Sequence, residues 1–345
     1  MFCFNSDYLE GAHPAVLQKL IDTNMMQLQG YGNDEITAEA KDLIRKACGC
    51  PDADVFFFPG GTPSNVTIID SLLNTYDGMI SAETGHINCH ECGAVEYTGH
   101  KVLPLPQHDG KIDAAELRQY IKDIYDNETW DHMVQPGGVY VSHPTEFGTL
   151  YKKSELEEIA SVCREYGIPL YMDGARLGYG FASAESDLTL KDIANICDAF
   201  YIGGTKVGAL CGEAVVFPKG NADRKFFTVM KQRCNILAKG RMTGAQFLAL
   251  FEDGLYFRIG KQAVDMALRL AEILRAHGIE PYVESPTNMQ FFIMDNALIS
   301  RLRKKVNFDV TEKYDEKRSI VRFVCSWATK SENIDEFEAA LLSVI

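Results

Sequence analysis

The chain has 345 residues, of which 46% are apolar and 24% charged, so it is long enough to bury a large core and to form more than one domain. Its net charge of −14, without a basic cluster, argues against nucleic acid or an anionic membrane as a partner and favours a small-molecule substrate. No run reaches the roughly 18 apolar residues of a membrane span, the amino terminus lacks signal-peptide features, and the ten scattered cysteines are typical of reduced thiols, so we expect a cytoplasmic protein.

Short β-branched or aromatic runs alternate with helical patterns between residues 55 and 217. This alternation is typical of a mostly parallel sheet with helices on both faces. It predicts seven strands, at residues 55–58, 79–81, 101–103, 138–142, 169–172, 199–202 and 214–217. The clearest of the intervening helices covers residues 153–166, with a capping box formed by Ser154 and Glu157 and a stop at Gly167.

The pattern changes after residue 217. Long helices are expected at residues 245–251 and 255–277, followed by shorter mixed elements and a last helix from residue 334. We therefore predict a large α/β domain over residues 1–245, which includes the amino-terminal segment, and a smaller carboxyl-terminal α+β domain over residues 246–345.

Two polar residues follow predicted strands of the large domain. Asp173 comes directly after the strand at 169–172, and Lys206 follows the strand at 199–202. Open α/β sheets bind ligands at the carboxyl ends of their strands. A carboxylate and an amine at that edge suit pyridoxal phosphate, which requires a lysine Schiff base and an acid for its pyridinium nitrogen. Taken singly, Lys206 can also be a surface lysine and Asp173 a turn or N-cap residue.

A possible phosphate site follows the first predicted strand. There the chain passes through Gly60, Gly61 and Thr62 to a helix start, and the free amides of a helix amino terminus accept phosphate. The segment has neither a Walker lysine nor a G-x-G-x-x-G pattern, so neither a nucleoside triphosphate nor a dinucleotide is indicated. Judged alone, it is equally an ordinary capped turn.

His86 follows the predicted strand at 79–81, where an imidazole could stack on a flat cofactor. A hydrogen-bonded surface histidine is the alternative. Cys89 and Cys92 have the spacing of a zinc-binding pair, but no second pair follows at the usual distance, so we predict no metal site. Arg176 and Arg322 could clamp a substrate carboxylate, although either residue alone is more often part of a structural ion pair.

Taken together, these residues resemble the threonine aldolase and β-eliminating lyase family of fold type I pyridoxal phosphate enzymes, and the resemblance spans nearly the full chain. It rests on an ordered set of motifs: Ser6-Asp7, Tyr31-Gly32-Asn33-Asp34, Pro59-Gly60-Gly61-Thr62, His86, Asp173-Gly174-Ala175-Arg176 and Lys206.

The resemblance implies roles for these residues. The substrate carboxylate would be held by Ser6, Arg176 and Arg322. Tyr31 would also bind the substrate. The cofactor would be held by Gly60, Gly61, Thr62, His86, Asp173, Arg176, Thr205 and Lys206, and by Arg241 from a neighbouring subunit. A homodimer or homotetramer with shared active sites is therefore expected.

One segment departs from the commoner threonine aldolase pattern. Glu146 stands where those enzymes carry a histidine near the substrate β-hydroxyl, and the surrounding residues look more like the phenylserine aldolase branch. The resemblance implies cleavage of the Cα–Cβ bond of an L-β-hydroxy-α-amino acid of the threonine, allo-threonine or phenylserine type, through a Lys206 Schiff base. The products are glycine and an aldehyde, with His86 as the first candidate for the base and Glu146 as the second. β-Elimination, transamination or a non-catalytic binding role are the alternatives.

Overall fold

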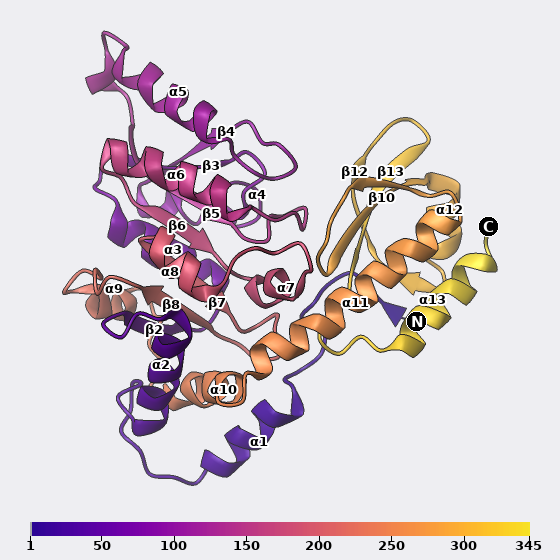
Figure 1. Ribbon diagram of the computed structural model, residues 1–345, viewed down its shortest axis with the longest axis horizontal. Coiled ribbons are helices and arrows are strands. Elements are labelled where there is room, and N and C mark those ends of the chain that lie inside the picture. Colours follow the sequence, from indigo (N-terminus) through magenta and orange to yellow (C-terminus); the bar gives the residue numbers. More distant parts are fainter. Residues whose placement is uncertain (1) are drawn as a thin grey trace.

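The computed structural model describes residues 2–345 (Figure 1). These residues form a main sheet of seven strands in the spatial order β2-β8-β7-β6-β5-β3-β4. In chain order the strands are β2 (Asp54–Phe58), β3 (Asp77–Ala82), β4 (Lys101–Leu105), β5 (Gln135–Ser142), β6 (Leu170–Asp173), β7 (Ala199–Gly203) and β8 (Glu213–Phe217). All seven predicted strands are confirmed, with ends that differ by three residues or fewer. Of these strands only β8 runs against the others, because it pairs antiparallel with both β2 and β7.

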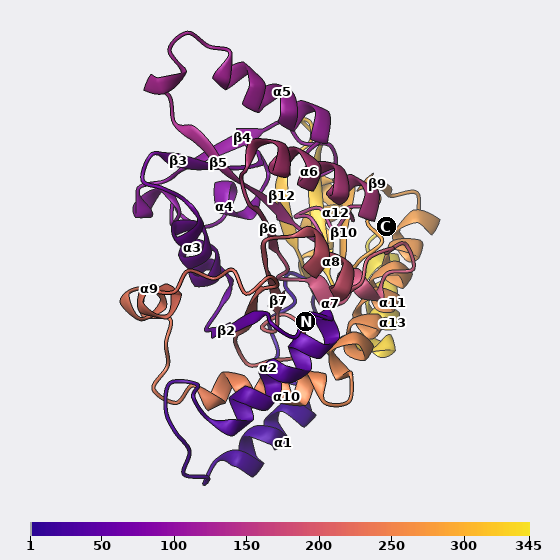
Figure 2. The ribbon, with the colours of Figure 1, turned by 60° about the vertical axis from the view of Figure 1, so that its left-hand side comes forward.

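Helices cover both faces of this sheet. One face packs against α2 (Glu35–Cys48), α5 (Ala114–Tyr125), α6 (Lys153–Tyr166), α8 (Leu190–Ile196) and α10 (Arg241–Phe251), and the other against α3 (Gly61–Leu72), α4 (His86–Cys89) and α9 (Phe226–Gln232). In Figure 2, α3, α4 and α9 lie on one side of the strands and α6 and α8 on the other. The two-residue period of a strand produces this division: in β5, Val139 and Val141 enter one core and Tyr140 the other.

A second, smaller unit contains an antiparallel sheet in the order β12-β13-β10-β9. Its elements are β9 (Glu280–Val283), β10 (Met289–Asp295), α12 (Asn296–Leu302), β12 (Asp309–Lys313), β13 (Arg318–Val324) and α13 (Ser331–Leu342). The long helix α11 (Leu255–Ala276) joins the two units (Figure 1), because its first half packs into the core of the main sheet and its second half into that of the small sheet.

The amino-terminal strand belongs with the smaller unit. β1 (Phe2–Cys3) pairs in parallel with β11 (Val306–Asn307), and the chain then returns through α1 (Pro14–Thr23) to pack against α10. The predicted domain boundary between residues 245 and 246 stays a prediction. Residues 2–3, which that prediction assigned to the large domain, pair with the smaller unit. Residues 2–345 contain no helix that is long and apolar enough to cross a membrane.

In helix α6 the predicted bounds and the predicted stop signal are confirmed, but the predicted N-terminal cap is not. Its bounds agree with the prediction, and Gly167 ends it in a left-handed conformation with φ of 68°. The capping box of Ser154 and Glu157 is wrong. The N-cap is Lys152, whose backbone N–H donates to Glu155 Oε2 at 2.6 Å. Because the helix begins at Lys153, directly after this N-cap, Ser154 already lies within its first turn.

Candidate active site

A cavity of about 310 Å³ opens at the carboxyl edge of the main sheet. Segments that follow β2, β3, β5, β6 and β7 converge there, as expected for parallel strands. The reversed strand β8 contributes its first residue, Glu213, because its amino end lies at the same edge. The cavity is lined by Tyr8, Pro59, Gly60, Gly61, Thr62, Asn65, His86, Glu91, Ser142, Pro144, Thr145, Glu146, Asp173, Ala175, Arg176, Tyr201, Thr205, Lys206 and Glu213.

Asp173 is the most extensively hydrogen-bonded carboxylate in this cavity. Its Oδ1 accepts from Tyr201 Oη at 2.5 Å and from the Ala175 backbone at 2.9 Å, and its Oδ2 accepts from Tyr140 Oη at 2.7 Å and from Asn65 Nδ2 at 3.0 Å. Burial works to raise the pKa of Asp173, but the nearby His86 imidazole and these hydrogen bonds outweigh it and leave the pKa below its usual value. The carboxylate is therefore held ionised in a fixed orientation.

Lys206 lines the same cavity and is partly buried. Its Nζ has no hydrogen-bond partner within residues 2–345, while its backbone carbonyl accepts from Tyr179 Oη at 2.5 Å. Burial, aided by the charge of Arg176, lowers the pKa of Lys206 against the opposing effect of nearby carboxylates. An amine whose neutral form is favoured by burial can act as a nucleophile.

Glu213 holds the segment that leads to Lys206. Its Oε2 accepts from the Gly204 backbone at 2.8 Å, and its Oε1 accepts from Thr205 Oγ1 at 2.7 Å. The Thr205 hydroxyl in turn accepts from the Gly212 backbone at 3.0 Å, so it closes this loop. Burial raises the pKa of Glu213 to about 7.

Arg176 reaches the cavity but already has an acidic partner. Its Nε donates to Asp7 Oδ2 at 2.7 Å and its Nη2 to Asp7 Oδ1 at 3.1 Å. Asn288 Nδ2 also donates to Asp7 at 2.9 Å. This fork leaves Nη1 of Arg176 without a hydrogen-bond partner among the described residues, so a bound anion could still be contacted by it.

His86 is held by two carboxylates. Its backbone N–H, at the start of α4, donates to Glu146 Oε1 at 2.8 Å, and that oxygen also accepts from Ser142 Oγ at 2.6 Å. The imidazole Nδ1 lies 2.7 Å from Glu91 Oε1. Burial raises the pKa of Glu146, and the hydrogen bond from Ser142 partly offsets this.

The predicted phosphate-binding residues Gly60, Gly61 and Thr62 lie at the start of α3. Gly60 is the N-cap residue and has no capping side chain, so the first amides of this 12-residue helix are not covered by one. At Gly61 a Cβ atom would lie 3.1 Å from Tyr201 Oη, a hydroxyl that donates to Asp173. Glycine at position 61 therefore lets the start of α3 lie close to Tyr201 and Asp173.

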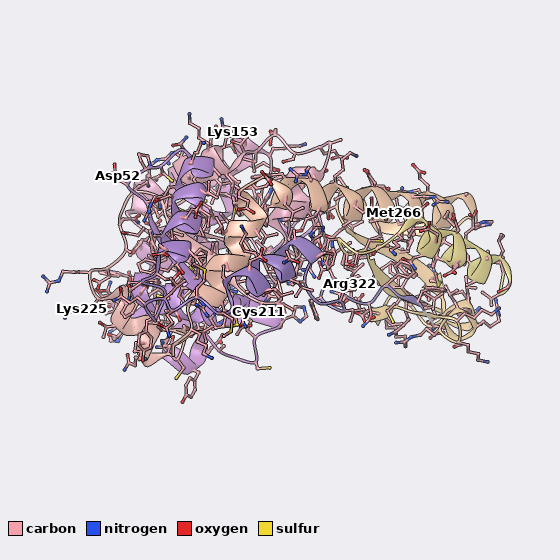
Figure 3. The ribbon with its side chains drawn as sticks, turned by 90° about the horizontal axis from the view of Figure 1, so that it is seen from below. Asp52, Lys153, Cys211, Lys225, Met266 and Arg322 are labelled. Atoms are coloured by element: carbon pink, nitrogen blue, oxygen red, sulfur yellow. The ribbon has the colours of Figure 1, made fainter. Side chains whose placement is uncertain are left out.

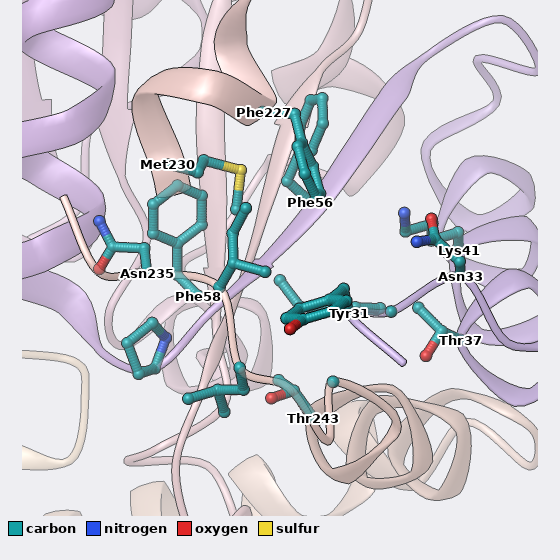
Figure 4. A pocket seen from close by; sticks show the side chains of 16 residues that line it. Tyr31, Asn33, Thr37, Lys41, Phe56, Phe58, Phe227, Met230, Asn235 and Thr243 are labelled. Carbon is teal, nitrogen blue, oxygen red and sulfur yellow. The ribbon is translucent and has the colours of Figure 1, made fainter. Parts of the chain in front are cut away.

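Four of the predicted site residues lie outside this cavity. Arg241 donates to the carbonyls of Asn24 and Met26, and Tyr31 lines a second cavity of about 210 Å³. Figure 4 shows Tyr31 facing Phe and Met side chains of that second cavity. Ser6 is buried and its Oγ has no partner among the described residues. Arg322 is paired with Asp309, on the side of the smaller unit that is nearest the larger one in Figure 3.

Five functional side chains were missed at the level of sequence: Asn65, Glu91, Tyr140, Tyr201 and Glu213. The two tyrosines bring a hydroxyl group into the buried apolar parts of β5 and β7, and Glu213 directly precedes a buried apolar run, so each of these polar groups was visible in the sequence. Asn65 and Glu91 carried no comparable signal, because only packing brings them beside Asp173 and His86. Within residues 2–345 no group of three or more His, Cys, Asp or Glu side chains is arranged to hold a metal ion.

Comparison with known proteins identifies the family. A family model described as β-eliminating lyase matches residues 4–297. A low-specificity L-threonine aldolase from a Pseudomonas species is 31% identical over 99% of this chain and 97% of its own length. The corresponding protein of Pseudomonas aeruginosa is 30% identical over 96% of this chain and 95% of its own length.

Solved structures agree with this relationship. A structure of Leishmania major threonine aldolase superposes with a TM-score of 0.96, at 38% identity and with 99% of each chain covered. An aspartate aminotransferase of Thermus thermophilus shares the fold alone, with a TM-score of 0.73 at 15% identity over 100% of this chain and 92% of its own. The chain therefore belongs to the β-eliminating lyase family and is a pyridoxal phosphate-dependent lyase with the fold type I architecture.

Proposed function

We propose that the protein is an aldolase that cleaves the Cα–Cβ bond of an L-β-hydroxy-α-amino acid and releases glycine and an aldehyde. Threonine, allo-threonine and phenylserine are the substrate types to compare. The observation that supports this most directly is the partly buried Lys206, whose amine has no hydrogen-bond partner within residues 2–345 and shares one cavity with the ionised Asp173. Two relatives of 30% and 31% identity carry the name low-specificity L-threonine aldolase.

The residues of the cavity fit pyridoxal phosphate. Lys206 would hold its aldehyde carbon, Asp173 its ring nitrogen, and the amides at the start of α3 its phosphate, with His86 and Ala175 beside the ring. The charge of the cavity supports this placement. Its lining contains four carboxyl side chains, of Glu91, Glu146, Asp173 and Glu213. Against these it has the basic side chains of Lys206 and Arg176, and Arg176 is paired with Asp7. Such a site favours a protonated ring nitrogen and a substrate ammonium group.

When bound, the cofactor supplies an electron sink that accepts the electron pair of a bond at the substrate α-carbon. The chain itself selects which bond is aligned. Arg176 presents Nη1 to the substrate carboxylate, and its fork to Asp7 keeps the guanidinium plane fixed. Ser6 and Arg322 would assist if the smaller unit moves toward the cavity, since each has a buried polar atom without a partner among residues 2–345.

A base must take the proton of the β-hydroxyl group. His86 is the first candidate, because its ring lines the cavity and its position is fixed by Glu146 and Glu91. Glu146 is the second. Its Oε1 is already occupied by the His86 amide and the Ser142 hydroxyl, which leaves one carboxylate oxygen for proton transfer.

Tyr31 and Arg241 belong to the proposed oligomer. Within their own chain they lie outside the cavity that contains Lys206. We therefore assign them to the active site of a neighbouring subunit in a homodimer or homotetramer.

The test is product analysis of the cofactor-loaded enzyme with threonine, allo-threonine, phenylserine and serine. Glycine and the matching aldehyde should form in equal amounts from the β-hydroxy amino acids, and a keto acid as the main product would contradict the proposal. Lys206→Ala should abolish both the visible absorbance of the bound cofactor and turnover. Lys304→Ala, an exposed lysine, is the matched control and should retain both.

A further inference from the structure

The Glu91 carboxylate has an asymmetric environment. Its side chain is fully buried. Its Oε1 lies 2.7 Å from His86 Nδ1 and accepts from Asn65 Nδ2 at 2.7 Å, whereas its Oε2 is buried with no hydrogen-bond partner in the part of the chain that the structure describes. Burial of a carboxylate oxygen without a partner opposes folding. Stability alone therefore does not account for an acid at this position.

We propose that Glu91 is the positioning residue that sets the tautomer of His86. It would keep the imidazole proton on Nδ1 and leave Nε2 unprotonated toward the cavity, as the atom that takes the β-hydroxyl proton. This inference rests on the proposed function in one respect, namely that His86 is the base. It goes beyond that function by assigning a role to a residue that touches neither substrate nor reacting atoms.

Hydrogen-bond chemistry fixes the direction. An ionised carboxylate only accepts hydrogen bonds, so at 2.7 Å the Nδ1 atom must be the donor. A neutral imidazole has one donor and one acceptor nitrogen, and Nε2 is then the acceptor. Nε2 has no hydrogen-bond partner within residues 2–345, and the ring lines the cavity with 34% of the side chain exposed.

Asn65 fixes Glu91 in turn. Its Oδ1 accepts from Tyr171 Oη at 2.7 Å, which determines the orientation of the amide. Its Nδ2 then donates one hydrogen to Glu91 and the other to Asp173 at 3.0 Å. The acid that orients the base and the acid that faces the cofactor ring are therefore positioned by the same amide.

The protons and electron pairs of the proposed Cα–Cβ cleavage balance. The β-hydroxyl O–H bond breaks and its proton moves to His86 Nε2. The oxygen electron pair forms the aldehyde carbonyl as the Cα–Cβ bond breaks, and the electron pair of that bond stays with the α-carbon fragment. That fragment takes up one proton from solvent to become glycine, and His86 releases the proton that it accepted to solvent, so the numbers of protons taken up and released are equal and no further reactant is needed. Glu91 stabilises the imidazolium through its contact with His86 Nδ1.

Three variants separate tautomer control from packing. Glu91→Gln keeps a carbonyl acceptor for Nδ1 but removes the charge, whereas Glu91→Leu removes the acceptor at similar size. His86→Gln identifies the His86 signals among the eight histidines and tests the base itself. Visible absorbance after cofactor loading reports whether each variant has folded.

The measurement is nitrogen-15 NMR of cofactor-free protein labelled at histidine, together with kcat and KM of the loaded enzyme. We expect a protonated Nδ1 in the wild type and in Glu91→Gln, and a protonated Nε2 in Glu91→Leu. In Glu91→Leu kcat should fall by about 10²–10⁴-fold with little change in KM, and Glu91→Gln should recover part of that loss.

A wild-type His86 that is protonated on Nε2, or a Glu91→Leu variant with normal tautomer and turnover, would overturn the proposal. Normal turnover in His86→Gln would show that His86 is not the base, and the proposal would fail for that reason. The tautomer seen in the wild-type spectrum would still show whether Glu91 determines which nitrogen of His86 is protonated. Failure of the proposed function is thereby distinguishable from failure of the Glu91 assignment.

Discussion

Glu213 offers a test of the electrostatics beside Lys206. Its buried carboxylate accepts from the Gly204 amide and the Thr205 hydroxyl, and its pKa is raised to about 7 by burial. Glu213→Gln preserves both contacts, because the amide oxygen can accept from Gly204 N–H and the NH₂ group can donate to Thr205 Oγ1. The hydroxyl oxygen has a second lone pair besides the one used by the Gly212 amide.

The sign of the effect follows from proton binding. Between the ordinary pKa of 4.5 and about 7 the folded protein holds a proton on Glu213 that the unfolded chain has lost. The contribution of this proton to stability is therefore fully present below pH 4.5 and is lost as the pH rises through about 7. At about 1.4 kcal/mol for each pH unit, the whole interval corresponds to roughly 3 kcal/mol.

The assay is urea unfolding of the cofactor-free wild type and Glu213→Gln between about pH 5 and about pH 8.5. Across this range the difference in unfolding free energy should change by about 2.5 kcal/mol in favour of the variant. An infrared band of a protonated carboxyl group should titrate near pH 7 in the wild type and be missing in the variant. Glu128→Gln, at an exposed position, is the control and should track the wild type at every pH. A pH-independent difference for Glu213→Gln would refute the buried-acid reasoning.

Two further predictions concern packing and assembly. Gly174→Ala should lower the free energy of unfolding by about 3 kcal/mol or more, because its Cβ would lie 2.0 Å from the Tyr201 carbonyl oxygen. Gly11→Ala, whose Cβ has no neighbour closer than 3.8 Å, should change it little, and equal urea midpoints for the two variants would contradict the packing argument. Arg241→Ala and Lys206→Ala should each be inactive, but unfolding and refolding them together should restore about a quarter of wild-type activity, since half of the dimers are mixed and contain one intact site. No recovery on mixing would show that Arg241 does not serve a neighbouring subunit.

Local pattern was sufficient for the sheet and its helices. The strands were recognisable because each is a short apolar run bounded by turn residues, and Asp173, Lys206 and His86 were recognisable because each follows such a run. The direction of β8 could not be predicted from the sequence, because a buried apolar strand has the same residue pattern in parallel and in antiparallel pairing. Its reversal is what brings Glu213 to the cavity, and for this reason the acid nearest the Lys206 segment was missed.

The hydrogen-bond network around the site depends on contacts far apart in sequence. Asn65 meets Asp173 across 108 residues, and Tyr171 orients Asn65 across 106. No local period encodes such a pair, because its geometry depends on how α3 packs over the strands. The same limit applies to Glu91, which lies only five residues beyond His86 but reaches it through the turn that follows α4.

The amino-acid sequence by itself therefore determined which residue types stand at the ends of which strands, since this depends on local hydrophobic pattern and turn chemistry. The tertiary structure decided which of them share a cavity. It joined Lys206, Asp173, His86 and Glu146, and it placed Tyr31 outside, together with Ser6, Arg241 and Arg322. The physical reason is that proximity between distant segments is set by strand order, strand direction and helix packing, which are properties of the whole chain.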